Sequence, residues 1–278
     1  MTEPGAGSDL SGITTSAVRD GDHYVLTGSK MFITNGVHGD LYFVGVKTDT
    51  SVKGSRGISI FAVEKGTPGF SAQEIKHKMS LRASVTGEIV LDDCRVPAAN
   101  LLPLSGGLKS PLGCLTQARY GIAWGAMGAA EFCWQGARDY TLGRKQFGRP
   151  IADNQGLAFM LADMEALVSS ARATYLHAAR LKDAGRPFAK AAAVAKLVAT
   201  DAAMRVTTDA VQVLGGAGYT QDFPVEQGQR SAVPVARRPA AHLRQVGHRQ
   251  VHGLGVERAR PRRPRAQLTG RVAFCCCR

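Results

Sequence analysis

The stretch MTEPGAGSDL, residues 1–10, is the first in the chain whose residue types could bind a charged ligand. Pro4 and the glycines around it disfavour helix and strand, so a loop is expected. Thr2 and Ser8 place hydroxyl groups beside backbone N–H groups that small neighbours leave open, and this arrangement suits a phosphate. An ordinary surface turn has the same composition, so this stretch by itself leaves both interpretations open.

The six cysteines could serve in metal binding or disulfide formation. Three are isolated, Cys94, Cys114 and Cys133, and three form the run 275–277. None has the spacing of a zinc site, so no metal site is predicted. The isolated three are expected to be buried thiols in a reducing compartment. Because no apolar run is long enough to span a membrane and no signal-peptide pattern opens the chain, the expected location is the cytoplasm.

The formal net charge of +13 would usually suggest a nucleic-acid or acidic-membrane partner. Residues 227–278, however, contain twelve arginines, no lysine and one acid, Glu257, so this tail holds +11 of the total. The remaining residues are therefore nearly neutral, and their charge does not indicate a nucleic-acid-binding protein.

The elements that must position the loop are predicted to be strands in residues 1–103. The turn signal Asp20-Gly21 is typical of a two-residue hairpin between strands at 15–19 and 23–26. Residues 96–103 are expected to be the exit linker. An antiparallel β-barrel or sandwich is therefore predicted. Its further strands are expected at 30–34, 41–46, 57–64 and 88–91.

Residues 104–226 change to a helical period and are predicted to form an incomplete up-down bundle of three helices. The first, at 111–140, is apolar enough to be buried on most sides. The second begins after Asp153-Asn154, and the third, at 187–214, ends at Gly215-Gly216. The fold class is thus α+β with more than one domain. The expected inward stripes are Leu157, Met160, Leu161, Met164, Leu167, Val168 and Ala171 on the second helix, and Val194, Leu197, Val198, Ala202 and Val206 on the third.

Four motifs in order give the chain its resemblance to the acyl-CoA dehydrogenases, a family of flavoenzymes. They are TEPGAGSD at 2–9, GSKMFITNG at 28–36, RKQFG at 144–148 and QVLGGAGYTQDFPVE at 212–226. SLRAS at 80–84 and ARYGIAWG at 118–125 resemble the glutaryl-CoA dehydrogenase branch, whereas the first 75 residues resemble straight-chain and long-chain members.

The resemblance implies a helical N-terminal domain, a middle β-barrel and a C-terminal four-helix bundle, with FAD between barrel and bundle and partly across a subunit interface. This chain begins at the barrel and is expected to lack the N-terminal domain and the fourth helix. The implied partners are an acyl-CoA substrate, electron-transfer flavoprotein as electron acceptor, and copies of the chain itself in a dimer or tetramer.

The resemblance also assigns residues to the site. Ser8 and Arg119 are implied near the acyl-CoA, and the Thr34 hydroxyl near flavin N5, where hydride arrives. Taken singly, Arg144 is typical of a solvated helix-end cation and Gly215-Gly216 of a helix cap, but together they favour a pyrophosphate. The implied FAD-binding set is Thr2, Gly7, Ser8, Phe32, Ile33, Thr34, Arg144, Gln146, Phe147, Gln155, Gln212, Gly215 and Gly216.

The implied reaction is α,β-dehydrogenation of an acyl-CoA, with a glutamate as the base. Most members carry this Glu in an E-G-T motif beyond the equivalent of Glu226, and a few carry it beside the equivalent of Arg119. No E-G-T motif follows Glu226 here, and the neighbour of Arg119 is Ala118. No catalytic residue is therefore predicted, and the activity of the chain is expected to be impaired.

The tail, residues 227–278, is rich in Arg and Pro and is expected to be disordered. Its composition suggests a frameshift or chimeric join just after Glu226, which would explain the missing base. A nucleic-acid-binding arm is the weaker interpretation, because Phe274 is its one aromatic residue. The predicted function is an FAD-dependent acyl-CoA dehydrogenase, the alternative being a non-catalytic flavin- or acyl-CoA-binding fragment.

Overall fold

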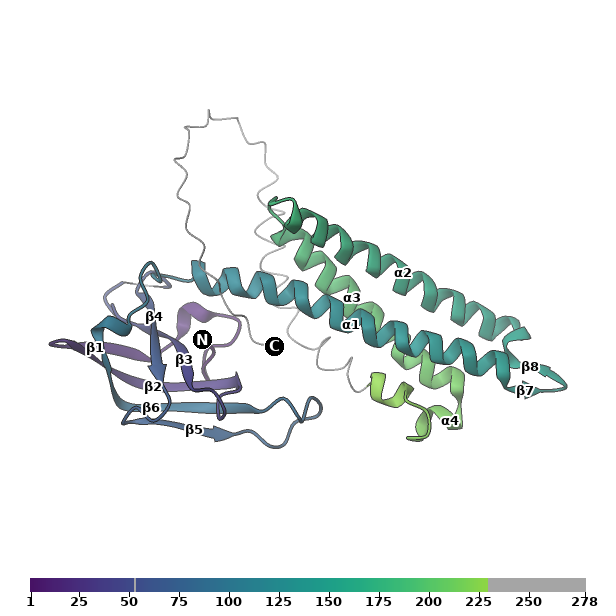
Figure 1. Ribbon diagram of the computed structural model, residues 1–278, viewed down its shortest axis with the longest axis horizontal. Helices are drawn as coiled ribbons and strands as arrows, with labels where there is room; N and C mark the ends of the chain where they lie inside the picture. The colour runs from purple at the N-terminus through teal and green to yellow at the C-terminus, as the bar shows by residue number, and fades with distance from the viewer. Residues whose placement is uncertain (53, 230–278) are drawn as a thin grey trace, which may run out of the picture. The chain divides into compact units, whose positions relative to one another are not determined.

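The computed structural model describes residues 1–52 and 54–229, and the predicted tail therefore lies outside the described residues except for its first three. Within the described part, six strands form one sheet in the order β4-β3-β1-β2-β6-β5, and helices follow it in the chain (Figure 1). The predicted α+β class is confirmed. The strands are β1 (Ser16–Asp20), β2 (His23–Thr34), β3 (Leu41–Lys47), β4 (Ile58–Glu64), β5 (Phe70–Glu74) and β6 (Thr86–Pro97).

The predicted hairpin is confirmed, because β1 pairs with β2 in antiparallel register from Ser16↔Thr27 to Asp20↔His23. The two strands predicted at 23–26 and 30–34 are one long strand, β2, which pairs with β6. Its register against β6 shifts twice, between Leu26 and Gly28 and between Lys30 and Ile33. The second shift produces a bulge at Phe32, where φ is +59°.

The sheet is not closed, and the predicted barrel is not confirmed. β4 and β5 stand at the two ends of the strand order, and no ladder joins them among the described residues. The pairing is antiparallel except at one point, Ser16↔Lys47, where β1 and β3 run parallel. Most buried side chains of this part form one cluster drawn from five strands, with Leu26, Val46, Phe61 and Leu91 almost fully buried. A second, smaller cluster consists of Ala6, Ile13 and Ile58.

The helical region contains the three long helices that the periodicity predicted, and they share one core. Consecutive helices run in opposite directions (Figure 1). Met164, Val168 and Ala171 of the second helix are buried in this core, as predicted. The elements are α1 (Lys109–Gly143), a short hairpin of β7 (Lys145–Gln146) and β8 (Arg149–Pro150), α2 (Gln155–Asp183), α3 (Ala189–Leu214) and α4 (Gly216–Tyr219), with 3₁₀ turns η1 (Leu10–Gly12), η2 (Ala98–Asn100) and η3 (Ile151–Asp153).

The predicted inward face of α3 is wrong at two positions. Val194 and Leu197 are 42% and 41% exposed, although Ala202 and Val206 are buried as expected. The buried face consists mostly of alanines, because α3 packs on both α1 and α2 and small side chains let helices approach closely. These alanines are Ala192, Ala195, Ala199, Ala202, Ala203 and Ala210.

Two further expectations are wrong. Helix α1 is not buried on most sides, since Trp124, Phe132 and Leu142 are 43%, 50% and 58% exposed in the described structure. Cys94 and Cys133 are buried thiols, but Cys114 is exposed, as are most residues in the first turns of α1. No helix in the described ranges is long and apolar enough to cross a bilayer.

Candidate functional site

The loop that precedes η1 is tied to strand β2 through Thr2. The Thr2 hydroxyl donates to the carbonyl oxygen of Met31 at 2.6 Å, and the Met31 N–H donates to the Thr2 carbonyl at 2.9 Å. A tight turn follows, because the N–H groups of Glu3 and Ala6 each donate to the carbonyl of the other residue. The Thr2 hydroxyl is therefore engaged with the strand rather than open to a ligand.

The side chain of Glu3, a residue of this loop, is buried, and five donors converge on its carboxylate. Oε2 accepts from the N–H of Thr14 at 2.6 Å and from its hydroxyl at 2.9 Å. Oε1 accepts from the N–H of Thr15 at 3.1 Å, from its hydroxyl at 2.5 Å and from Lys30 Nζ at 2.6 Å. The side chains of Glu3 and Lys30 are 4% and 2% exposed, so this is a buried ion pair whose acceptor is fully hydrogen-bonded.

The titration of this pair follows from its surroundings. Burial favours the neutral form of Glu3, but the hydrogen bonds from Lys30, Thr14 and Thr15 outweigh it and lower the pKa of Glu3 to about 2. Burial also lowers the pKa of Lys30 from its usual value, against the opposing effect of Glu3. Sequence reasoning missed both residues, and the signal that could have found them is a lysine in the middle of a strand.

The β2 bulge lies directly after Lys30 and Met31. Phe32 has a positive φ, which is rare for an aromatic residue, and its side chain is 70% exposed. Ile33 is half-buried against the sheet core, and Thr34 is exposed. The bulge therefore presents an aromatic ring and a hydroxyl at the end of β2, next to the strand position that anchors the loop.

The outer part of the loop carries groups that are open to a ligand. Gly7 and Ser8 are exposed, and within the described residues their N–H groups and the Ser8 hydroxyl have no hydrogen-bond partner. Asp9 turns away from them, since its carboxylate caps η1 by accepting from the Ser11 N–H at 3.0 Å. The buried Glu3 carboxylate with its five donors, called the Glu3 anchor below, thus supports a loop with three groups available to a ligand. These groups are the N–H groups of Gly7 and Ser8 and the Ser8 hydroxyl.

The second group of assigned residues lies at one end of the helical bundle. The β7–β8 hairpin has Phe147 and Gly148 at its tip with φ of +52° and +79°, as expected for a two-residue turn. Phe147 is 98% exposed. A ring held in open solvent by an unfavourable backbone conformation is typical of a residue that contacts a ligand or a partner.

The antiparallel helices bring the other assigned residues to this same end (Figure 1). Gln155 opens α2, Gln212 lies in the last turn of α3, and Gly215 with φ of +60° ends that helix. Arg144 directly follows α1, and its backbone N–H donates to the Tyr140 carbonyl at 2.8 Å. All seven assigned residues of the bundle are exposed: Arg144, Gln146, Phe147, Gln155, Gln212, Gly215 and Gly216.

Arg119 does not belong to this group, because it lies in the first third of α1. It is half-buried and has no ion-pair partner in the part of the chain that the structure describes. Burial lowers its pKa from the usual value. Its neighbour Ala118 is exposed and carries no group that could act as a base.

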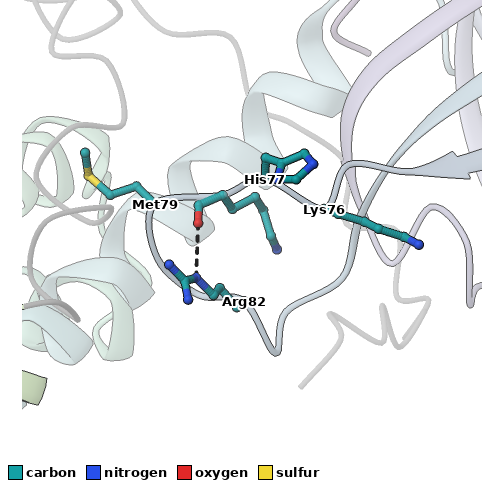
Figure 2. Close-up of a pocket in the computed structure, with 5 residues that line it drawn as sticks. Lys76, His77, Met79 and Arg82 are labelled. Atoms are coloured by element: carbon teal, nitrogen blue, oxygen red, sulfur yellow. Dashed lines mark hydrogen bonds between the residues drawn. The ribbon is translucent and has the colours of Figure 1, made fainter.

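A pocket of about 540 Å³ lies on the loop between β5 and β6 (Figure 2). It is lined by Lys76, His77, Lys78, Met79 and Arg82, none of which the sequence assigned to a site. Lys78 organises the loop, since its ammonium donates to the carbonyls of Leu81 and Ser84 and to the Thr86 hydroxyl. The Arg82 Nε donates to the Lys78 carbonyl at 3.3 Å, the bond drawn in Figure 2.

Comparison with known proteins gives two family matches. Residues 1–94 match the model described as acyl-CoA dehydrogenase, middle domain, and residues 105–235 match acyl-CoA dehydrogenase, C-terminal domain. The chain is 48% identical over 233 residues to a short-chain-specific acyl-CoA dehydrogenase of Clostridium acetobutylicum, covering 84% of this chain and 61% of that relative. It therefore spans about three fifths of the length of the curated relatives it matches.

Two solved structures are similar as well. One was reported for the electron transferring flavoprotein of Acidaminococcus fermentans, with 46% identity and a TM-score of 0.84 over 90% of this chain and 66% of that chain. The other is a glutaryl-CoA dehydrogenase from Mycobacterium smegmatis in complex with FADH2, with 36% identity and a TM-score of 0.83 over 92% of this chain and 66% of that chain.

Proposed function

The chain belongs to the acyl-CoA dehydrogenase family, and on that premise we propose that its sheet and its helical bundle each carry part of an FAD site for the α,β-dehydrogenation of an acyl-CoA. The observation that carries this proposal is the open amide pair Gly7–Ser8, anchored to β2 beside the exposed Phe32 bulge. One of the similar structures is a complex with FADH2. Flavin, when bound, supplies the acceptor for the hydride that leaves the β-carbon of the thioester.

The residues of the sheet fit such a cofactor. Two adjacent N–H groups without partners, flanked by a glycine, can donate to phosphate oxygens without steric obstruction. Phe32, Ile33 and Thr34 offer a ring, an aliphatic contact and a hydroxyl to the planar isoalloxazine. Ser8 is also proposed to contact the acyl-CoA.

The residues at the bundle end fit the nucleotide half of the cofactor. Arg144 and the amides beside Gly215-Gly216 are donors suited to pyrophosphate oxygens, and the exposed ring of Phe147 suits an adenine. We assign this end to the cofactor of a neighbouring copy of the chain, so that the site requires a homo-oligomer. Gln146, Gln155 and Gln212 are proposed to orient the same nucleotide through their amide groups.

The catalytic base is the missing part. Position 118 holds Ala, and no E-G-T motif follows Glu226. We therefore propose weak or absent turnover for this chain, with Arg119 near the thioester of the bound acyl-CoA. The proposed substrate is a short straight-chain or a dicarboxylic acyl-CoA, since the two similar enzymes are named for short-chain and glutaryl substrates.

The remaining expectations stay proposals. Electron-transfer flavoprotein is the proposed electron acceptor, because a structure reported under that name is 46% identical to this chain. A dimeric or tetrameric state and a cytoplasmic location are proposed with it. The Arg-rich tail beyond residue 229, with its proposed frameshift, lies outside the described residues.

Purified chain tests the function directly. We expect a yellow protein whose bound FAD absorbs near the usual flavin bands, and little dye-linked turnover with butyryl-, octanoyl- or glutaryl-CoA. Colourless protein that takes up no added FAD contradicts the proposed function. Yellow protein that binds acyl-CoA without any turnover identifies a non-catalytic binding fragment.

Matched variants locate the cofactor. Arg144→Gln is expected to weaken FAD binding by about tenfold, since a hydrogen bond to a charged group is lost. Arg186→Gln removes an exposed arginine from the opposite end of the bundle and is expected to leave FAD affinity unchanged. If the two variants bind FAD with equal affinity, Arg144 does not contact the cofactor.

A further inference from the structure

The buried Glu3–Lys30 pair joins two segments that the proposed FAD site uses separately. Glu3 belongs to the loop of residues 2–9, and Lys30 precedes the β2 bulge by two residues. Thr2 and Met31, the neighbours of the pair on either side, are joined by two further hydrogen bonds. The loop and the bulge are therefore bonded at two successive positions, and one cannot shift without the other.

The anchor extends into the sheet. Thr15, which donates twice to Glu3, also directs its hydroxyl to the Ser29 carbonyl at 3.2 Å. The Lys47 N–H of β3 donates to the Thr15 carbonyl at 2.8 Å. Glu3 is thus held by the two residues that precede β1 and by Lys30 in the middle of β2, and these two strands are paired with each other.

Removing two charges from water costs free energy that offsets most of their mutual attraction. Stability alone therefore does not explain this buried pair. A pair of apolar side chains would fill the same space. Five hydrogen bonds converge on the carboxylate of the charged pair, and each one restricts its position and orientation. Such a pair therefore permits a single geometry, which apolar side chains would not impose. The two segments proposed to contact the cofactor follow this pair directly in the chain: the rest of the loop follows Glu3, and the Phe32 bulge follows Lys30.

We propose that Glu3 and Lys30 are positioning residues of the FAD site, which hold the open amides of Gly7 and Ser8 and the Phe32 bulge in one fixed relation. The inference rests on the proposed FAD-binding function. Neither residue is required to touch the cofactor. Their effect is exerted through the loop and the strand that they join.

The test compares Glu3→Gln, Lys30→Met and the double variant E3Q/K30M with a control of similar stability. Val63→Ala on β4 is that control, because Val63 is fully buried in the sheet core and does not contact the pair. Affinity for FAD and the shape of the bound-flavin absorption band are measured at a temperature where every variant remains folded.

We expect E3Q to bind FAD about tenfold more weakly with an altered flavin band, and V63A to bind as the parent chain does. K30M is expected to be the least stable single variant, since it leaves a buried carboxylate unpaired. The double variant is expected to regain stability over K30M without regaining FAD affinity. Recovery of both together, or parent-like affinity in folded E3Q, overturns the proposal.

Hydrogen exchange separates this proposal from the proposed function. In E3Q the amides of residues 2–9 and of residues 31–34 are expected to exchange faster together, whether or not FAD is present. If the parent chain binds no FAD but exchange rises together in both segments of E3Q, the proposed FAD-binding function is wrong. The coupling of the loop and the bulge through Glu3 and Lys30 is then still supported. Faster exchange in only one of the two segments contradicts the link.

Discussion

Gly28 of β2 passes so close to Thr15 that a Cβ at position 28 would lie 2.7 Å from both the Cα and the hydroxyl oxygen of Thr15. Gly28 also has φ of +144°, a conformation that residues with a side chain rarely adopt. Thr15 is one of the two threonines that hold the Glu3 carboxylate. A glycine is therefore required at this position both by the backbone and by the packing of the Glu3 anchor.

Gly28→Ala is expected to destabilise the chain by about 3 kcal/mol, because backbone strain and a clash with main-chain atoms act together. Gly21→Ala is the matched control. Gly21 also has a positive φ, +62°, but a Cβ there meets nothing within 4 Å, so about 1 kcal/mol is expected. Urea denaturation measures both, and equal losses would show that the contact with Thr15 costs nothing.

Acid stability is expected to depend on Glu3. The pKa of Glu3 is about 2 in the folded chain against 4.5 as the ordinary value, so its ionised form stabilises the fold above pH 4.5. That contribution is lost as the pH falls from 4.5 towards 2, where the carboxylate takes up a proton.

Denaturant titrations between pH 7 and pH 2 measure this loss as the difference between the parent chain and Glu3→Gln. The difference is expected to be largest at neutral pH and to shrink through this window. Asp20→Asn, which breaks an exposed ion pair with Arg95, is the control and should show little difference at any pH. Curves for E3Q and the parent chain that stay parallel below pH 4.5 would refute the role of Glu3.

Local patterns in the sequence were sufficient for most strands and all three long helices. The hairpin at Asp20-Gly21 is a turn preference of two residues, and the α2 stripe is a simple helical period. β5 (Phe70–Glu74) was missed because it is a short edge strand that pairs only with β6 and has no fully buried residue. The bulge at Phe32 was missed because a register shift depends on the partner strand.

The candidate site was predictable as motifs but not as an arrangement. The RKQFG and QVLGG stretches predicted donors, and only the antiparallel packing of α1, α2 and α3 brings Arg144, Gln155 and Gln212 to one end. Glu3 and Lys30 were not predicted, since each is an unremarkable charge until the fold pairs them across 27 positions. On α3, both a stripe of larger apolar residues and a face of alanines could have been buried. The alanine face is the buried one, because small side chains let the helices pack closely.

Lys78 is expected to fix the conformation of the loop between β5 and β6. Its ammonium holds two carbonyls and one hydroxyl of residues 81–86, and Leu81 in this loop has φ of +50°. Lys78→Met should therefore speed hydrogen exchange at residues 79–86 while lowering the stability of the whole chain by less than about 1 kcal/mol.

Lys76→Met is the control for this loop. Lys76 lines the same pocket, but it is exposed and its side chain makes no hydrogen bond in the described structure. Its substitution should leave exchange in the loop unchanged. If both variants loosen the loop equally, the positive charge of the segment matters rather than the three bonds of Lys78.

The contact between Cys133 of α1 and Gly228 tests whether residues 227–229 pack against the helical bundle. Gly228 is buried, Val225 beside it is 2% exposed, and a Cβ on Gly228 would lie 2.1 Å from Cys133 Sγ. Gly228→Ala should thus cost about 2 kcal/mol through the clash, although alanine is the better helix former in residues 225–229.

Cys133→Ala removes the sulfur and should make Gly228→Ala nearly neutral, so the double-mutant cycle is expected to give a coupling of about 2 kcal/mol. The single variant C133A serves as the reference for the lost hydrogen bond from the thiol to the Val225 carbonyl. Denaturant unfolding followed by far-ultraviolet circular dichroism measures all four chains. A coupling near zero would mean that residues 227–229 do not pack against α1 in solution, and that the bundle ends at Glu226 as its sequence predicted.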